Sequence, residues 1–140
     1  MALAVLGTMG AGCYVGFNSL NTYAVSSRLF SEAQTCAQNQ IDLILSKEPF
    51  DVTTNPQKIP AVLALGTTTT PNVFVYNDPV SGNVTVTGTM TTTITDTGAT
   101  INFTGVNTNL NVRRATVTVS YTYRGKNYAV SMDTMRTADQ

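Results

Sequence analysis

The chain begins with a long apolar segment, and no charged side chain occurs before Arg28. Residues 1–17 are apolar or small, and Thr8 is the only hydroxyl among them apart from Tyr14. As a helix, residues 1–20 would measure about 30 Å, close to the thickness of a bilayer's hydrocarbon core. A soluble domain of 140 residues rarely buries such a helix on all sides. The segment therefore predicts burial in lipid or against other helices.

Three ordinary interpretations of this segment compete. A secretory signal peptide requires a basic start and a cleavage site, but no Lys or Arg precedes the apolar run. A membrane anchor fits the length, although an anchor usually leads into a basic flank or a linker. A buried core helix is the third, and the segment is too long and too uniformly apolar for a core of this size.

The helical pattern continues past the apolar segment. From Tyr23 onward, apolar residues recur at a period near 3.6, with polar residues on the other side. We predict one helix of roughly 48 residues, about 70 Å long, that ends between Ser46 and Glu48, because the residue before Pro49 disfavours helical geometry. Its second half is expected to pack on a globular domain through Leu29, Phe30, Ala33, Ala37, Ile41 and Ile44.

Four glycines interrupt the apolar half of this helix, at Gly7, Gly10, Gly12 and Gly16. Each one costs about 1 kcal/mol relative to alanine in a helix that water surrounds. They indicate either close helix–helix contact, which small residues permit, or a segment that unwinds or stretches when it leaves a membrane.

After Pro49 the sequence changes character. Of the 25 threonines, 22 follow residue 50, and threonine alternates there with valine, isoleucine and aromatic residues, as in strands with one buried face. Arg124-Gly125 resembles the tip of a hairpin. The predicted strands are residues 61–66, 72–77, 83–90, 91–95, 99–104, 112–123 and 126–135.

These strands follow one another without crossover helices, so the sheet is expected to be antiparallel. We therefore predict an α+β chain, in which one long N-terminal α-helix packs by its C-terminal half on an antiparallel β-sheet. Residues 1–48 form the helix, with an apolar half at 1–25 and an amphipathic half at 26–48, and residues 49–140 form the threonine-rich β domain.

Several classes of function lack their usual signals. Eight basic residues balance eight acidic ones, which disfavours a nucleic-acid partner. Histidine is missing, and no glycine-rich phosphate loop or GxSxG elbow occurs. Asp78, Asp96 and Asp133 are expected to be solvated turn residues, and Arg113 and Arg114 should point to opposite faces of a strand. We expect no enzyme, no cofactor and no metal site.

The two cysteines, Cys13 and Cys36, are 23 positions apart on the predicted helix, which is about 35 Å. A disulfide needs Cα atoms within about 7 Å, so the two cannot pair within one continuous helix. They are expected to be free, packed thiols, and a bond between neighbouring subunits is the alternative.

The threonine-rich stretches permit two interpretations. The simpler is strand propensity with hydroxyl ladders on a solvated face. The other is O-glycosylation on an exposed surface, for which Thr68 and Thr92 are candidates. Asn83 and Asn102 also match the short acceptor pattern for N-glycosylation.

Three stretches together resemble the type IV pilin and pseudopilin family. The charge-free start ALAVLG precedes small and aromatic residues, SSRLFSEAQTCAQNQIDLIL (Ser26 to Leu45) is similar to helices of the minor-pilin-like branch, and VTVSYTYRGKNYAVSMDTMRT (Val117 to Thr137) is similar to its final hairpin. The family's basic leader and early glutamate would lie upstream of Met1, because the first acidic residue here is Glu32. If Met1 is instead the true start, the family's processing and glutamate-guided assembly do not apply.

The resemblance implies a pilin-like fold and a structural subunit of a type IV pilus-like extracellular filament, with a role in cell adhesion. The subunit would be anchored in the inner membrane before assembly, would be handled by prepilin peptidase and the pilus assembly machinery, and would then form a helical homopolymer on the cell surface. The expected helix contacts in the filament core are Leu3, Val5, Leu6, Met9, Val15, Phe17 and Leu20.

Two other functions fit the same sequence. A minor pseudopilin of a type II secretion system would initiate or cap a short periplasmic fibre and would be scarce. A membrane-anchored β binding module would never polymerise. Abundance would distinguish a minor pseudopilin from a major pilin. The residues upstream of Met1 would distinguish a membrane-anchored module from both kinds of pilin.

Overall fold

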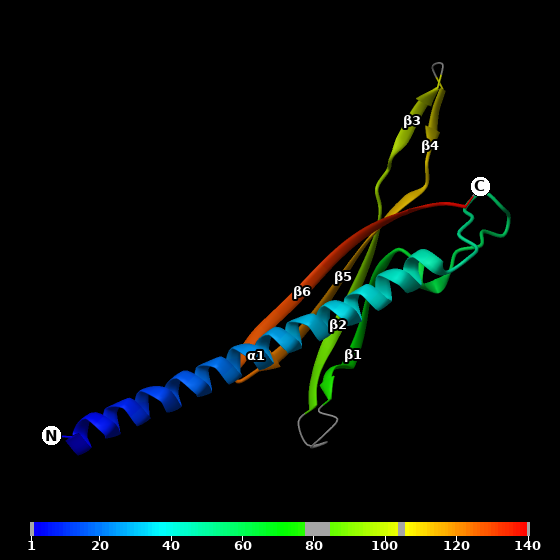
Figure 1. Ribbon diagram of the computed structural model, residues 1–140. Coiled ribbons are helices and arrows are strands. Elements are labelled where there is room, and N and C mark those ends of the chain that lie inside the picture. The colour runs from blue at the N-terminus through cyan, green and yellow to red at the C-terminus, as the bar shows by residue number, and fades with distance from the viewer. Residues whose placement is uncertain (1, 78–84, 104–105, 140) are drawn as a thin grey trace.

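One helix dominates the molecule. The computed structural model describes residues 2–77, 85–103 and 106–139. Helix α1 covers Ala2–Ser46, 45 residues, which is about 68 Å of continuous helix. Its end at Ser46 confirms the prediction that Pro49 limits it. Figure 1 shows the first part of α1 extending alone from the rest of the chain, while the second part lies along the sheet.

The second part of the chain forms a four-stranded antiparallel sheet and a separate two-stranded hairpin. The strand order in the sheet is β1-β2-β5-β6, and the hairpin of β3 and β4 is inserted between β2 and β5. The predicted α+β class and antiparallel pairing are confirmed. The strands are β1 (Gly66–Asn77), β2 (Thr85–Asp96), β3 (Thr100–Phe103), β4 (Val106–Asn109), β5 (Val112–Tyr123) and β6 (Lys126–Thr137).

The hydrophobic core lies between the second half of α1 and one face of the sheet. Five of the six helix residues expected there, Leu29, Ala33, Ala37, Ile41 and Ile44, are at most 5% exposed. Alanine at two of these positions allows the helix axis to approach the sheet closely. The sheet and the loops complete the core with Phe50, Leu63, Val75, Val86, Ile94, Ala115, Val117, Val119, Tyr121 and Val130.

The expectation for Phe30 is wrong, because its side chain is 46% exposed. Consecutive helix residues are rotated by about 100°, so Leu29 and Phe30 cannot both face the same sheet squarely. Leu29, at 1% exposure, occupies the buried position. The ring of Phe30 is left on the flank of the helix.

Three strand boundaries differ from the prediction. Residues 61–63 form a short 3-10 helix, η1 (Ala61–Leu63), rather than a strand. The stretches predicted separately as 83–90 and 91–95 meet in the single strand β2, which begins at Thr85, while residues 83 and 84 lie outside the described ones. Strand β1 also continues through Pro71, at a register shift between Thr70 and Val73. An edge strand accommodates such a proline because one row of its N–H groups has no ladder partner.

Strand β4 was not predicted, and it pairs with β3 in a short hairpin that continues the ends of β2 and β5. The turn at Arg124 and Gly125 was predicted and is confirmed. Both residues have positive φ, 49° and 72°, which is the geometry of a type I′ turn between twisted strands.

Pairing across the sheet explains much of the threonine content. Thr69 pairs with Thr91, Thr91 with Thr118, and Thr118 with Ser131, so one row of hydroxyls crosses all four strands on the face away from the helix. The Thr118 and Ser131 hydroxyls lie 3.0 Å apart. β-Branched threonine suits strands, and its hydroxyl suits a solvated face.

The structure bears differently on each candidate glycosylation residue. Thr92 pairs with Val117 on the helix side and is 6% exposed, so its hydroxyl is not accessible in the folded chain and that expectation is wrong. Thr68 is exposed on edge strand β1. Asn83 lies outside the described residues, and Asn102 lies in β3 with its side chain outside the described ones.

Candidate assembly surface

The first part of α1, residues 2–17, extends beyond the sheet, and we call it the projecting half. Neighbours from the sheet begin with Asn18 and Ser19, which share a shallow hollow with Lys126 and Tyr128. The Arg124 guanidinium then donates a hydrogen bond of 3.0 Å to the Thr22 hydroxyl. About 24 Å of helix therefore extends past its last support.

Large apolar side chains cover the projecting half and the turn that follows it. Filament contacts with other copies were predicted at Met9, Val15, Phe17 and Leu20. In the single chain these four side chains are between 63% and 73% exposed. The side chains of Leu3, Val5 and Leu6 lie outside the described ones. Isolated exposed apolar residues are ordinary on soluble proteins, but a contiguous apolar surface marks an interaction site.

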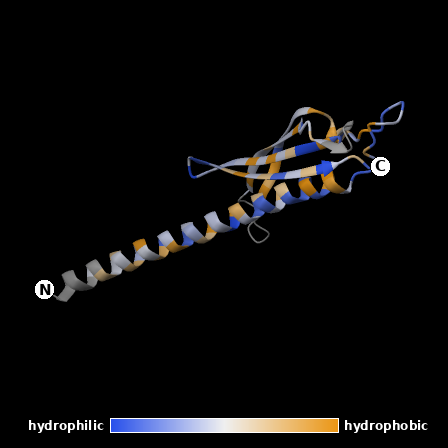
Figure 2. Cartoon of the chain, turned by 90° about the horizontal axis from the view of Figure 1, so that it is seen from above, coloured by the Kyte–Doolittle hydropathy of each residue, from blue (hydrophilic) through white to orange (hydrophobic). Residues whose placement is uncertain are grey.

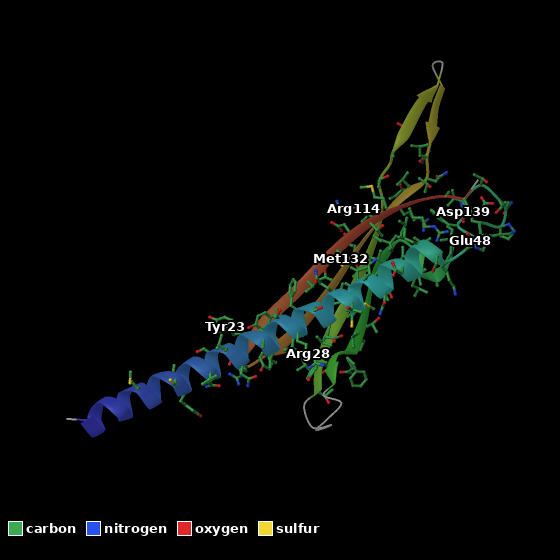
Figure 3. The ribbon with its side chains drawn as sticks, viewed as in Figure 1. Tyr23, Arg28, Glu48, Arg114, Met132 and Asp139 are labelled. Carbon is green, nitrogen blue, oxygen red and sulfur yellow. The ribbon has the colours of Figure 1, made fainter. Side chains whose placement is uncertain are left out.

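Charge is missing from the same segment and begins where the helix meets the sheet. Arg28 is the first charged residue, and its guanidinium lies over the Tyr76 ring, 4.8 Å from the ring centre. Along the coloured turns of the projecting half, Figure 2 shows pale and orange residues, and it shows deep blue ones beside the sheet. Figure 3 places Arg28 against the sheet. The unpaired helix surface is therefore neutral and apolar.

The four glycines of the projecting half have no packing role within this chain. All four lie inside α1, and a Cβ added to Gly7, Gly10, Gly12 or Gly16 would meet no atom within 4 Å. Gly88, in contrast, is required by the fold, because a Cβ there would lie 2.6 Å from the Ser120 carbonyl oxygen. Close helix contact and unwinding both stay predictions for these glycines.

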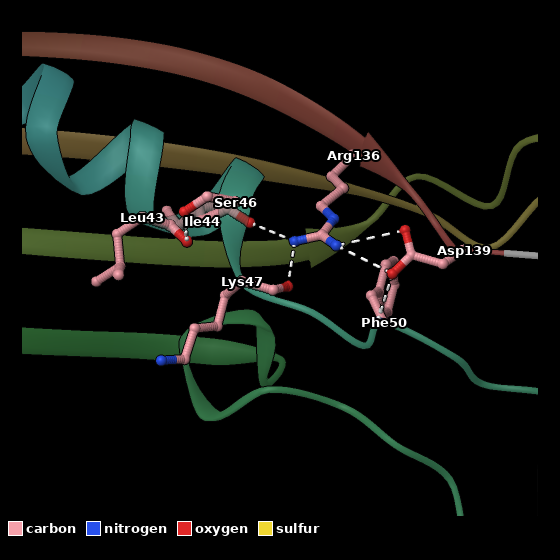
Figure 4. A network of polar contacts seen from close by, with 7 residues as sticks. All are labelled: Leu43, Ile44, Ser46, Lys47, Phe50, Arg136 and Asp139. Carbon is pink, nitrogen blue, oxygen red and sulfur yellow. Dashed lines mark hydrogen bonds and ion pairs between the residues drawn. The ribbon is translucent and has the colours of Figure 1, made fainter.

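A clamp of four residues, Arg113, Arg136, Phe50 and Asp139, fixes the far end of α1, and we call it the C-terminal clamp. The Arg136 guanidinium donates to the carbonyl oxygens of Ile44, at 2.8 Å, and Lys47 (Figure 4). These carbonyls belong to the end of the helix, where backbone acceptors lack partners and a cation is favourable.

The rest of the clamp joins the chain terminus and the loop after the helix. The Phe50 N–H donates to Asp139 Oδ2 at 2.8 Å, and Arg136 Nη2 approaches the same oxygen at 3.1 Å. The hydrogen bond from Phe50, followed by that from Arg136, holds the pKa of Asp139 below its usual value. Arg113 donates to the Leu63 carbonyl and lies over the Phe50 ring.

Sequence reasoning missed this clamp, although one signal was present. Arg113 is 9% exposed and Arg136 8%, and the two are register partners on β5 and β6. Side chains alternate between the two faces of a strand, and Arg113 shares the buried face of β5 with Ala115. Arg136 likewise shares the buried face of β6 with Val130. A charged residue on the buried face predicts a satisfied interior cation.

Arg114 faces the opposite side of β5, as the alternation of the strand predicted. It forms an ion pair with Asp133 at 2.7 Å, with both side chains about half exposed. The Thr116 hydroxyl and then Arg114 lower the pKa of Asp133. This ion pair lies on the surface of the sheet, and exposed pairs of this kind add little stability.

Both cysteines are free thiols. Cys13 is exposed on the projecting half. Cys36 lies against β1, where its thiol donates to the Phe74 carbonyl at 3.4 Å. Burial, with a smaller effect of the Glu32 charge, raises the pKa of the Cys36 thiol, which disfavours the reactive thiolate.

The β domain has a shallow hollow of about 550 Å³ beside the register shift of β1. Its lining includes Asn72, Thr89, Ser120 and Asn127 and contains no carboxylate, lysine, arginine or cysteine. Among the residues that the structure describes, no cluster of His, Cys, Asp or Glu side chains is placed to hold a metal ion. Within that same part of the chain, no helix combines the length and apolar character that a membrane crossing requires.

Comparison with protein-family models, with curated proteins and with solved structures finds no match for this chain. The feature that stands out in the structure is the projecting half, an apolar helix without a partner.

Proposed function

We propose that this chain is the structural subunit of a type IV pilus-like extracellular filament and that it polymerises through the projecting half of α1. The observation that supports the proposal is a helix whose first half leaves Met9, Val15, Phe17 and Leu20 at least 63% exposed. The second half of the same helix is anchored in a core by the C-terminal clamp. The projecting half thus has a fixed direction but nothing of its own to pack on.

The free energy available from covering this surface is large. Burying one Val, Leu, Met or Phe side chain contributes about 1.5–3 kcal/mol, so these four residues could supply about 6–12 kcal/mol. Association costs roughly 4–15 kcal/mol in lost translational and rotational freedom. A single contact would therefore be marginal, and contacts with several neighbours would exceed the cost.

The directions of the exposed side chains favour several neighbours. At about 100° per residue, Met9, Tyr14 and Val15 point in directions roughly 100° or more apart. One partner helix covers only one side of this surface, so a dimer would leave the others in water. A bundle of many parallel copies covers every side. When the rotation between successive copies does not close into a ring, such contacts produce an open helical polymer.

Other parts of the proposal rest on the sequence resemblance to pilins. Before assembly, the apolar helix would be stored in the inner membrane, and prepilin peptidase and the assembly machinery would process and extract it. The pilin-like character of the fold belongs to the same proposal. A long helix that packs by one half on an antiparallel sheet agrees with it. A minor pseudopilin would use the same surface in a shorter fibre.

The proposal can be tested with one pair of variants of the full chain. Phe17 and Phe74 are 73% and 67% exposed, but only Phe17 lies on the projecting half. The detergent-solubilised protein would be brought below the detergent's micelle concentration, sedimented and imaged by electron microscopy. Phe17→Ser should raise the critical concentration for filaments about 10- to 100-fold, because about 1.5–3 kcal/mol of burial is lost. Phe74→Ser should stay within about twofold of the wild type.

Two results would contradict the proposal. One is a wild-type chain that stays monodisperse at every concentration after the detergent is removed. The other is an equal effect of the two serine variants, which would place the assembly contact elsewhere. Circular dichroism of both variants in detergent would check that the fold is retained.

A further inference from the structure

The hairpin of β3 and β4 forms an arm beyond the body of the molecule. Its strands, Thr100–Phe103 and Val106–Asn109, make their main contacts with each other, and Figure 1 shows the arm pointing away from both the helix and the sheet. An isolated two-stranded hairpin is at best marginally stable in water. The arm would therefore be stabilised by pairing with a further strand, and in the described part of the single chain its strands pair only with each other.

The two edges of the main sheet differ in how they are protected. Edge strand β1 contains Pro71, a positive φ of 58° at Asn72 and two register shifts. Such irregularities are the means by which proteins prevent another strand from pairing with an edge. Edge strand β6 pairs with β5 in unbroken register from Lys126 to Thr137 and contains no proline. It is therefore the edge that can accept another strand.

The turn between β5 and β6 determines which β6 groups point outward. In a two-residue type I′ hairpin the closing pair, here Tyr123 and Lys126, is hydrogen-bonded, and bonded and non-bonded pairs alternate from there. The N–H and C=O groups of the intervening β6 residues then point away from β5. These residues are Asn127, Ala129, Ser131, Asp133 and Met135, and all are exposed.

The arm and the projecting half leave the body at opposite ends. Arg124, in the turn between β5 and β6, contacts Thr22, near the projecting half. The arm begins where Thr97 bonds to the Val112 carbonyl, and Val112 pairs with Thr137 beside the C-terminal clamp. A contact between the arm of one copy and the side of another joins two different surfaces, and such a heterologous contact produces an open filament when the rotation between copies does not close into a ring.

We propose that the β3–β4 arm of one copy pairs with the β6 edge of the next copy, so that the sheet continues across the boundary between subunits. The inference rests on the proposed function, because the neighbour is the adjacent subunit of the same filament. It adds a second contact, made of backbone hydrogen bonds on the outside, to the apolar contact of the helices. Strand addition to an open edge is a known means of protein recognition.

The first test uses a matched pair of substitutions on the β6 edge. Ser131→Pro removes an outward N–H, whereas Ser131→Ala removes only the hydroxyl and keeps that N–H. Ser131→Pro should raise the critical concentration for filaments by about 3- to 10-fold. Ser131→Ala should leave it within about twofold. Equal effects of proline and alanine would overturn the inference.

The second test removes the arm. Replacing residues 98–111 by Asn-Gly joins Thr97 to Val112 through a two-residue hairpin turn, and so keeps the sheet. The armless chain should assemble at least as poorly as Ser131→Pro, and adding Ser131→Pro to it should change nothing further, because the two changes act on the same contact. Additive effects, or an armless chain that assembles like the wild type, would overturn the inference.

Hydrogen exchange gives an answer that does not depend on how the variants fold. In wild-type filaments, the amides of Ala129 and Ser131 should exchange at least tenfold more slowly than in detergent-dispersed chains. Equal exchange in filaments and dispersed chains would overturn the arm contact and leave the proposed function standing. A wild-type chain that forms no filaments would overturn both.

Discussion

Arg136 shows how this chain accommodates a charge in its interior. The side chain is 8% exposed, yet it bonds to two carbonyl oxygens at the end of α1 and to the Asp139 carboxylate. No basic residue lies in the last turn of the helix itself. The cation that a helix end favours is thus supplied by strand β6. The same contact fixes the helix on the sheet.

Removing Arg136 should destabilise the fold far more than removing the neighbouring surface arginine. Arg136→Ala leaves the Ile44 and Lys47 carbonyls without this donor, and we expect the free energy of unfolding to fall by about 3 kcal/mol. Arg114→Ala breaks an ion pair whose side chains are 50% and 49% exposed, and should cost at most about 1 kcal/mol. Urea unfolding of the dispersed chains measures both, and equal losses would contradict the clamp.

Asp139 should make the stability of the clamp depend on acid. Its pKa is lowered in the folded chain, chiefly by the hydrogen bond from Phe50 and also by Arg136. A lowered pKa stabilises the fold above the ordinary carboxyl value, about 3.9, and this contribution is lost as the pH falls through the folded pKa. Asp139→Asn should therefore flatten the fall in melting temperature below about pH 4. An unchanged slope would show that Asp139 does not contribute.

Elements of this chain could be predicted where the determining signals are local. The end of α1 follows from Pro49, and the turn at Arg124 and Gly125 follows from its own residues. The C-terminal clamp joins residues up to 92 positions apart, so only the register of β5 and β6 reveals it. Strand β1 continues through Pro71 because it is an edge, and position in a sheet cannot be seen in a sequence.

Two glycines from different elements should respond oppositely to alanine. Gly12→Ala meets no atom and removes the helical cost of glycine, so the dispersed chain should gain up to about 1 kcal/mol. Gly88→Ala places its Cβ 2.6 Å from the Ser120 carbonyl oxygen, and should lose about 1–3 kcal/mol. Thermal unfolding followed by circular dichroism measures both. A Gly12→Ala chain that is less stable would point to a contact that the described chain does not contain.

At the scale of the whole molecule, three parts have different relations to solvent. The core between α1 and the sheet is complete, and the threonine face is suited to water. The projecting half lies outside the core and is also poorly suited to water, because it is neutral, apolar and unsupported. The sequence alone predicted this division along α1, since charge and period both change near Arg28. It could not predict the arm, which depends on how β3 and β4 pair.

The central claim is that the projecting half becomes buried in a filament made of this chain. The most direct measurement is to shear filaments from the native cells, image them, and identify the dominant protein and its N-terminal peptide by mass spectrometry. We predict a helical fibre dominated by this chain, with the residues corresponding to the projecting half packed in its centre. A chain that is missing from every fibre and remains with the membrane at full length would contradict the claim.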